Sequence, residues 1–196
     1  MVSSPAVNNP IIAALDLPDA NNALKLAQQI APAVGAFKIG KELFTAAGPD
    51  VVHRVRDLGT DVFLDLKFHD IPSTVYKAVK AINFLKVNYL SIHGLGGSKM
   101  IKAATKAASY TKILTVSLLS HHNQKSINEL GIEKSIKNEI KKLIFIAIKN
   151  NTAGLILAPK DLEIAKKIKK NIVIFAPGIR ERKNKKHEHK RSMDPL

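Results

Sequence analysis

Short apolar runs alternate along the chain with longer segments in which apolar residues recur at helical spacing. The runs predict strands at 11–16, 36–40, 61–68, 88–93, 113–119, 154–158 and 171–176. The longer segments predict helices at 19–31, 42–58, 72–86, 97–108, 133–150 and 160–169. Regular alternation of strands and helices implies a parallel sheet with right-handed crossovers, and near-continuously apolar strands fit burial on both faces.

Two of the predicted helices carry recognisable start signals. Asp19 is a candidate N-cap for the first helix, and Ser73 or Thr74 for the helix at 72–86. Pro72 suits a first helical turn, where its missing N–H costs nothing.

Polar residues at the strand ends distinguish between two parallel architectures. A barrel collects functional groups from the carboxyl ends of many strands, whereas an open doubly wound sheet concentrates them at one switch point. Six polar residues fall at or just beyond the ends of five predicted strands, with Asp65 and Lys67 on the same one: Asp16, Lys38, Asp65, Lys67, His93 and Ser120. We therefore expect an α/β fold of the (β/α)8 TIM-barrel type.

Composition limits the domain organisation and the cellular setting. The chain of 196 residues is 45% hydrophobic and has no cysteine, which is typical of a folded domain in a reducing compartment. We expect a flexible N-terminus at 1–10 and a single barrel domain at 11–196. The polar start "MVSSPAVNNP" has no apolar core of a signal peptide, and no apolar run is long enough for a membrane helix. The expected location is the cytoplasm, without membrane attachment.

The net charge of +15 raises the possibility of a nucleic-acid partner. The charge is uneven, with a dense basic run, "RERKNKKHEHKR", at 180–191. Aromatic residues make up only 5% and tryptophan is absent, so stacking platforms for single strands are scarce. Solvated lysine faces and a general affinity for anionic ligands explain the charge better than nucleic-acid binding.

The stretch "FLDLKFHDIPST" at 63–74 places charges in a strand that should enter the core. Side chains alternate along a strand, so Phe63, Asp65 and Lys67 share the face that points into the barrel. Lys38, on the preceding strand, brings a second ammonium group to the same rim. A structural ion pair would account for Asp65 and Lys67 alone, but a larger array of buried charges is costly to build for packing and indicates a functional site.

The same residues carry a resemblance to the orotidine 5'-monophosphate decarboxylase family, most closely to its bacterial branch. The family pattern D-x-K-x-x-D-I-P-x-T matches residues 65–74. Further matches follow in order across 11–196: "ALD" at 14–16, "FKIGKELFTAAGP" at 37–49, "IHGLGG" at 92–97 and "PGIR" at 177–180. Related sugar-phosphate decarboxylases share D-x-K-x-x-D, whereas Ile71-Pro72 and "FKIGKELF" favour the orotidylate enzymes.

The resemblance implies cofactor-free decarboxylation of orotidine 5'-monophosphate to uridine 5'-monophosphate and CO2, in de novo pyrimidine synthesis, by a homodimer. Lys38, Asp65, Lys67 and Asp70 correspond to the family's charged catalytic residues. Asp70 is expected to reach the partner subunit's site.

The resemblance also assigns separate roles to the substrate-binding residues. Asp65 would lie near the substrate carboxylate, while Lys67 would stabilise the developing carbanion and protonate C6. Asp16 and Lys38 would hold the ribose hydroxyls, and Ser120 would contact the pyrimidine edge. Ile71 and Thr74 would lie beside Asp70. The matches after the seventh strand would belong to the phosphate site: Pro177, Gly178, Arg180 and His189.

The C-terminal part departs from the family pattern. The basic loop lacks the family's usual glycine, His189 stands where glutamine is expected, and the sequence stops after "RSMDPL". We therefore expect a barrel that lacks the eighth strand and last helix, with unpaired edges on its first and seventh strands.

Two alternatives stay open on sequence grounds. One is a sugar-phosphate decarboxylase of the same superfamily, and the other is a non-catalytic remnant that binds anions through its basic C-terminal run. The histidines in "HH" at 121–122 and "HEH" at 187–189 lack a third ligand at suitable spacing, so no metal site is expected.

Overall fold

The computed structural model describes residues 9–168 and 172–179, and in that part of the chain seven parallel strands form one sheet. Strand order follows the sequence, so each strand pairs with its predecessor and its successor. The strands are β1 (Ile12–Ala14), β2 (Ala36–Gly40), β3 (Asp61–Phe68), β4 (Tyr89–His93), β5 (Lys112–Val116), β6 (Gly154–Ile156) and β7 (Val173–Phe175). All seven fall within or next to the predicted runs, and β2 and β3 match their predicted bounds.

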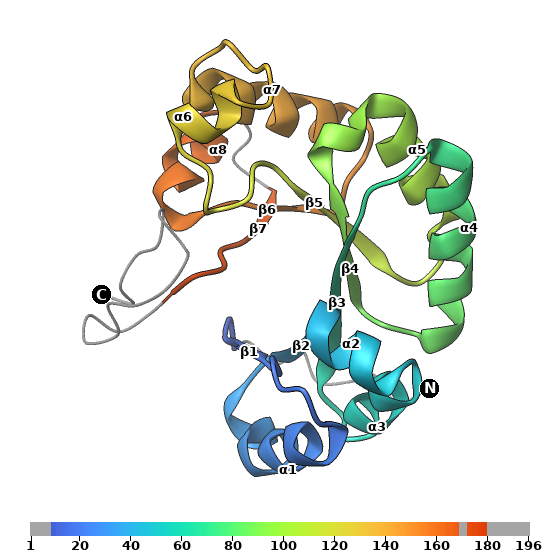
Figure 1. The fold of residues 1–196 in the computed structure, drawn as a ribbon. Coiled ribbons are helices and arrows are strands. Elements are labelled where there is room, and N and C mark those ends of the chain that lie inside the picture. The colour runs from blue at the N-terminus through green and yellow to red at the C-terminus, as the bar shows by residue number, and fades with distance from the viewer. Residues whose placement is uncertain (1–8, 169–171, 180–196) are drawn as a thin grey trace.

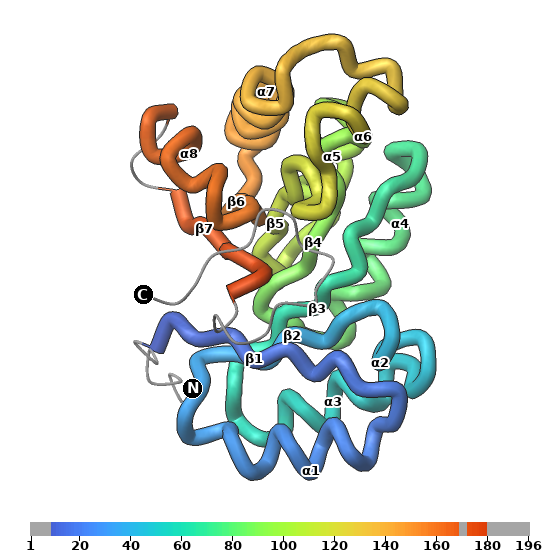
Figure 2. The backbone as a smooth tube through the Cα atoms, turned by 60° about the vertical axis from the view of Figure 1, so that its left-hand side comes forward, coloured from blue at the N-terminus to red at the C-terminus, as the bar shows by residue number. Residues whose placement is uncertain are grey.

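The sheet curls into a half-barrel with the helices on its outer, convex side (Figure 1). The expectation of a (β/α) barrel-type α/β fold is thereby confirmed. β1 and β7 are the two ends of the curl and do not pair with each other within the described residues (Figure 2). Within residues 9–168 and 172–179 no eighth strand follows β7. The basic run at 180–191 lies outside the described residues.

Each strand from β1 to β6 is followed by helix, as the alternating pattern predicts. The longer helices are α1 (Ala20–Ile30), α4 (Pro72–Ile82), α5 (Gly97–Ala107) and α7 (Ile136–Lys149). Shorter ones are α2 (Lys41–Ala47), α3 (Asp50–Arg56), α6 (Gln124–Asn128) and α8 (Leu162–Ile168), with 3-10 turns at 31–33, 83–85, 94–96 and 159–161.

The helix starts confirm one predicted cap and correct another. The Asp19 carboxylate accepts hydrogen bonds from the N–H groups of Asn21 and Asn22, as expected of an N-cap. At α4 the cap position is Ile71, and Pro72 occupies the first turn. The prediction of Ser73 or Thr74 as the cap was wrong, because Pro72 already starts the helix.

The predicted helix at 42–58 is in fact two helices. Gly48, at the end of α2, has a φ of 66°, a left-handed conformation that glycine adopts without strain, and Pro49 follows it. The chain therefore turns before α3 begins. The prediction also missed α6, a short helix whose Asn123 and Ser126 form a capping box.

Apolar side chains fill two layers, one between the sheet and the helices and one inside the curl. The inner layer groups Phe63, Leu114, Val116 and Ile156, each buried. Phe175 packs against it, with its ring centroid 5.5 Å from that of Phe63 and 5.0 Å from that of Tyr89. This layer forms an apolar floor beneath the carboxyl ends of the strands.

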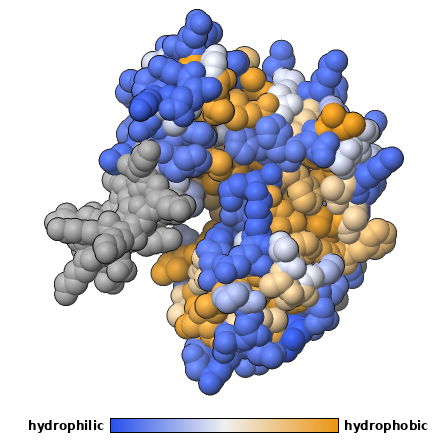
Figure 3. Space-filling view, viewed as in Figure 1, coloured by the Kyte–Doolittle hydropathy of each residue, from blue (hydrophilic) through white to orange (hydrophobic). Residues whose placement is uncertain are grey.

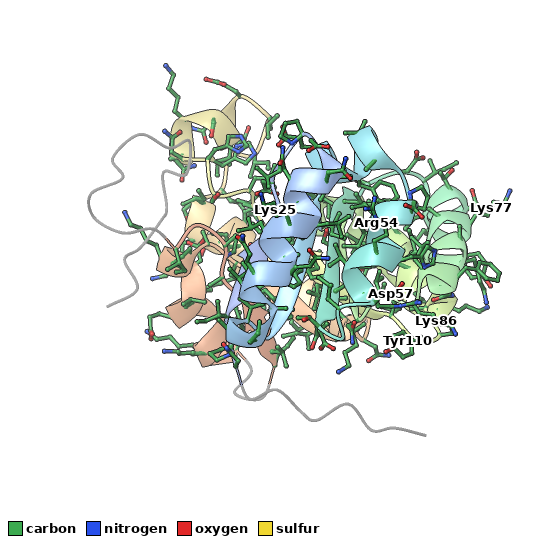
Figure 4. The ribbon with its side chains drawn as sticks, turned by 90° about the horizontal axis from the view of Figure 1, so that it is seen from below. Lys25, Arg54, Asp57, Lys77, Lys86 and Tyr110 are labelled. Atoms are coloured by element: carbon green, nitrogen blue, oxygen red, sulfur yellow. The ribbon has the colours of Figure 1, made fainter. Side chains whose placement is uncertain are left out.

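Polar side chains lie around that floor and on the outer helices. The space-filling view shows an opening near the centre of the face in Figure 3, with hydrophilic residues along its edge. On the outside, Lys25 of α1, Arg54 of α3 and Lys77 of α4 are exposed (Figure 4). The lysines of α7 and α8 are exposed as well, so the predicted solvated lysine faces are present: Lys137, Lys141, Lys142, Lys149, Lys166 and Lys167. No described helix has both the length and the apolar character to cross a membrane.

Candidate active site

Three charged side chains meet inside the curl, at the carboxyl ends of β2 and β3. The Lys67 ammonium lies 2.7 Å from Asp65 Oδ2, and the Lys38 ammonium lies 4.0 Å from the same oxygen. Leu66 and Phe68, which alternate with them, pack against the core under the helices. The predicted inward and outward faces of this strand are confirmed.

Asp16 extends the array from the loop after β1. Its Oδ1 accepts a hydrogen bond of 2.7 Å from the Lys38 ammonium. Gly40 makes this approach possible, because a Cβ there would lie 2.8 Å from Asp16 Oδ1 and 3.2 Å from Lys38 Nζ. The result is a chain of alternating charges, Asp16, Lys38, Asp65 and Lys67. The sequence pattern predicted that Lys38, Asp65 and Lys67 meet at this rim, but it did not predict Asp16 as the second aspartate of the array.

The charges at the centre of the array are largely removed from water. The side chain of Asp65 is 13% exposed, that of Lys38 20% and that of Lys67 26%. Taking charges out of water costs several kcal/mol per ion unless opposite charges and hydrogen bonds compensate. A fold gains little stability from such an array, so its presence indicates chemistry on a charged substrate.

The backbone of β3 is irregular where it carries these groups. Its pairing with β4 joins Leu64 to Leu90 and then Phe68 to Ile92, so extra residues bulge out of β3 between these points. Lys67 lies in the bulge with a φ of 52°, in the left-handed region that residues other than glycine seldom adopt. Strain of this kind persists where surrounding contacts fix it, commonly at functional sites.

Asp70 and its neighbours lie outside the ion-paired array. Asp70 Oδ1 accepts a 2.6 Å hydrogen bond from the N–H of Ile71, and in the described part of the chain Asp70 forms no ion pair with either lysine. Ile71 is 64% exposed, and Thr74 is exposed on the first turn of α4. This loop borders a pocket of about 560 Å³ lined by His69, Asp70, Ile71, Pro72, Leu95 and Gly96.

The remaining predicted residues are only partly placed by the structure. Ser120 follows β5 at the same edge of the sheet and is half-buried. Pro177 and Gly178 follow β7, with Pro177 exposed and Gly178 buried at a φ of 83°. Arg180 and His189 lie outside the described residues.

Comparison with known protein families gives a match that covers the described site. The model of the "Orotidine 5'-phosphate decarboxylase / HUMPS family" matches residues 9–196. The chain belongs to this family. The match covers both the strand with the charged array and the segments on either side of it.

Individual family members are similar over most of their length. An orotidine 5'-phosphate decarboxylase of Methylacidiphilum infernorum is 40% identical over 187 residues, which cover 94% of this chain and 81% of the relative. A Nitrosomonas europaea protein of the same name is 38% identical, covering 89% and 77%. A solved orotidine 5'-phosphate decarboxylase structure from Lactobacillus acidophilus superposes with a TM-score of 0.78 at 31% identity, covering 88% of this chain and 82% of that one.

Two residues on β4 lie next to the charged array but were not recognised as site residues from the sequence pattern. Ser91 is fully buried and hydrogen-bonds with both Asp65 and Lys67. His93 was predicted only as a polar strand end, and its ring stacks on that of His69 at a centroid distance of 5.3 Å. The strict alternation of Tyr89, Ser91 and His93 was the available signal, because it places all three on the inner face.

His93 is held in its neutral form by its surroundings. Burial is the largest cause, and the neighbouring groups His69, Lys67, His122 and Lys41 add to it, so that together they lower the pKa of His93 to about 4. Its Nδ1 accepts a hydrogen bond from the N–H of Leu95, so the neutral ring carries its proton on Nε2.

Among the described residues no group of three or more His, Cys, Asp or Glu side chains is placed to hold a metal.

The buried neutral His93 should make the fold less stable in acid. The unfolded chain takes up a proton near pH 6.5 and the folded chain only near pH 4, so stability falls as pH drops through this window and the loss is complete below it. The expected loss is about 3 kcal/mol. Urea unfolding at pH 7 and pH 4 should show a smaller acid effect in His93→Gln than in the wild-type chain. An equal acid effect in both would exclude His93 as the source.

Proposed function

We propose that this chain decarboxylates orotidine 5'-monophosphate to uridine 5'-monophosphate and CO2, the last step of de novo uridylate synthesis. The observation that carries the proposal is the array in which Asp65 lies between the ammonium groups of Lys67 and Lys38 above an apolar floor. The names of the similar bacterial proteins support this substrate over a sugar phosphate. We also propose a cytoplasmic location, which fits a sequence without cysteine.

The array can supply the two things that this reaction needs. Breaking the bond between C6 and the carboxyl carbon leaves an electron pair on C6, in the plane of the pyrimidine ring, where no conjugation can spread it. The Lys67 ammonium would stabilise this charge electrostatically and then donate a proton from Nζ to C6. Asp65 would face the substrate carboxylate, which favours loss of that group as CO2.

The other residues would bind the parts of the substrate that do not react. Asp16 and Lys38, paired at 2.7 Å, would hold ribose hydroxyls beside the array. Ser120 would contact the pyrimidine edge, and Pro177, Gly178, Arg180 and His189 would form the phosphate site. Binding energy gained far from the reacting bond lowers the barrier only if the reacting groups are well placed, which is the task of the array.

We further propose that the enzyme is a homodimer with shared sites. Asp70 makes no ion pair with Lys38 or Lys67 of its own chain in the described ranges, and Ile71 beside it presents an exposed apolar side chain. Contact with a second subunit would bury Ile71 and bring Asp70 and Thr74 to the partner's array. Residues 11–196 would act in this dimer as one barrel domain.

The proposed substrate is tested by offering the purified chain two candidates. Orotidine 5'-monophosphate should lose its absorbance as uridine 5'-monophosphate forms, with release of one CO2 per molecule. A phosphorylated sugar acid should release none. Turnover of the sugar acid alone would assign the chain to the sugar-phosphate decarboxylases, and turnover of neither would support a remnant that only binds anions.

A further inference from the structure

One buried hydroxyl on β4 connects the two central charges of the site. Ser91 is fully buried, and its Oγ donates a 2.8 Å hydrogen bond to Asp65 Oδ1. The same oxygen accepts a 2.8 Å hydrogen bond from the backbone N–H of Lys67. The Ser91 Oγ atom therefore contacts two proposed catalytic residues at once, Asp65 and Lys67.

The bond to Asp65 determines which carboxylate oxygen faces the lysines. With Oδ1 held by Ser91, Oδ2 is left to accept from Lys67 at 2.7 Å and to face Lys38 at 4.0 Å. Without the Ser91 hydroxyl, Oδ1 of Asp65 would lose this donor, and the carboxylate would be free to rotate. A fixed carboxylate is what the proposed reaction needs, since misplacement by about 1 Å can cost about 100-fold in rate.

The bond from Lys67 stabilises the bulge of β3. In the regular part of the sheet, backbone N–H groups pair with the neighbouring strand, but the β3–β4 register shifts between Leu64 and Phe68. The Lys67 N–H lies inside this shift and finds the Ser91 hydroxyl as its acceptor. An N–H left without a partner here would favour a different backbone path, because the φ of Lys67, 52°, is already strained.

We propose that Ser91 is a positioning residue of the decarboxylation site, which fixes the Asp65 carboxylate and the bulge that directs the Lys67 side chain back onto it. The role requires a hydroxyl, since a side-chain hydroxyl donates and accepts full-strength hydrogen bonds at a single small atom. Alanine does neither, cysteine does both weakly, and threonine does both while fitting a strand. The kinetic part of this inference rests on the proposed function.

The test compares kcat and KM for variants at Ser91 with a matched control. Ser91→Ala should lower kcat about 100-fold and change KM less than about threefold, because the substrate-binding groups are intact while the reacting groups are misplaced. Ser91→Thr should restore kcat to within about tenfold of wild type. The control is Thr111→Val. Thr111 lies just before β5, and its buried hydroxyl donates a hydrogen bond to the Val87 carbonyl. Removing this hydroxyl should leave kcat unchanged.

Melting temperatures separate positioning from general stability. If Ser91→Ala fails to fold, Ser91→Cys takes its place, with the same loss of kcat expected. A kcat within about threefold of wild type in the folded variant overturns the proposal. So does an equal loss of kcat in Thr111→Val, which would show that any buried hydroxyl has this effect.

A crystal structure of Ser91→Ala makes the test independent of turnover. The Asp65 carboxylate should rotate and the φ of Lys67 should leave the left-handed region. Unchanged positions of Asp65 and Lys67 would refute the positioning role even if the wild-type chain proved inactive on orotidine 5'-monophosphate. Inactivity of the wild-type chain, in contrast, would refute the proposed function and leave this structural comparison valid.

Discussion

Replacement of Lys67 by alanine is expected to lower decarboxylation by a factor of about 10⁴ or more, because one side chain supplies both charge stabilisation and the proton. Lys67 is the ammonium group nearest to Asp65, at 2.7 Å, and it lies above the apolar floor where a pyrimidine ring would rest. Water, at the same place, would provide neither a fixed positive charge nor an oriented acid. The substrate should still bind measurably, since Asp16 and Lys38 are intact.

The measurement is loss of orotidylate absorbance, with binding of uridine 5'-monophosphate followed separately. Lys67→Arg separates the two roles of the lysine, because guanidinium keeps the charge but does not release a proton. We expect Lys67→Arg to be nearly as inactive as Lys67→Ala. Lys25→Ala, which removes an exposed lysine from the outside of α1, should retain full activity (Figure 4). Substantial turnover by either Lys67 variant would remove this lysine as the proton donor.

Asp70→Ala and Lys38→Ala are each expected to be inactive alone and to regain activity when mixed. The reason is the proposed shared site, in which Lys38 comes from one subunit and Asp70 from the other. After dissociation and reassociation, half of the dimers would be mixed, and each would hold one complete site of two. Activity should therefore recover to about a quarter of wild type, as the symmetry of a two-fold dimer requires.

A second pair of variants provides the control for this experiment. Lys38 and Lys67 both face Asp65 of their own chain, so mixing Lys38→Ala with Lys67→Ala leaves every site incomplete. That mixture should stay inactive. If mixing Asp70→Ala with Lys38→Ala also restores nothing, Asp70 acts within its own subunit or has no role in the reaction. Sedimentation of the wild-type chain shows separately whether the dimer forms.

Local patterns in the sequence were enough to predict the strands and the inward face of the charged strand. Alternation along a strand predicted Asp65 and Lys67 on the inner face and Leu66 and Phe68 on the outer one, and the structure confirms this placement although a bulge interrupts the extended backbone at Lys67. The pairing of Lys38 with this strand also follows from chain order, because consecutive strands of a parallel barrel are neighbours. The helix break after Gly48 shows the limit of periodicity, which continues through the turn while the backbone does not.

Only the tertiary structure shows which atoms of neighbouring strands meet. The role of Ser91 depends on the register shift between β3 and β4, and a shift in register leaves no trace in the alternation of either strand. The neutral state of His93 likewise depends on burial and on four neighbouring groups that come from three other segments of the chain. The sequence by itself determined the strands, the longer helices, the family and the charged residues, because these follow from local order. Hydrogen-bond partners, strain and protonation depend on distances across the sheet, which exist only once the chain is folded.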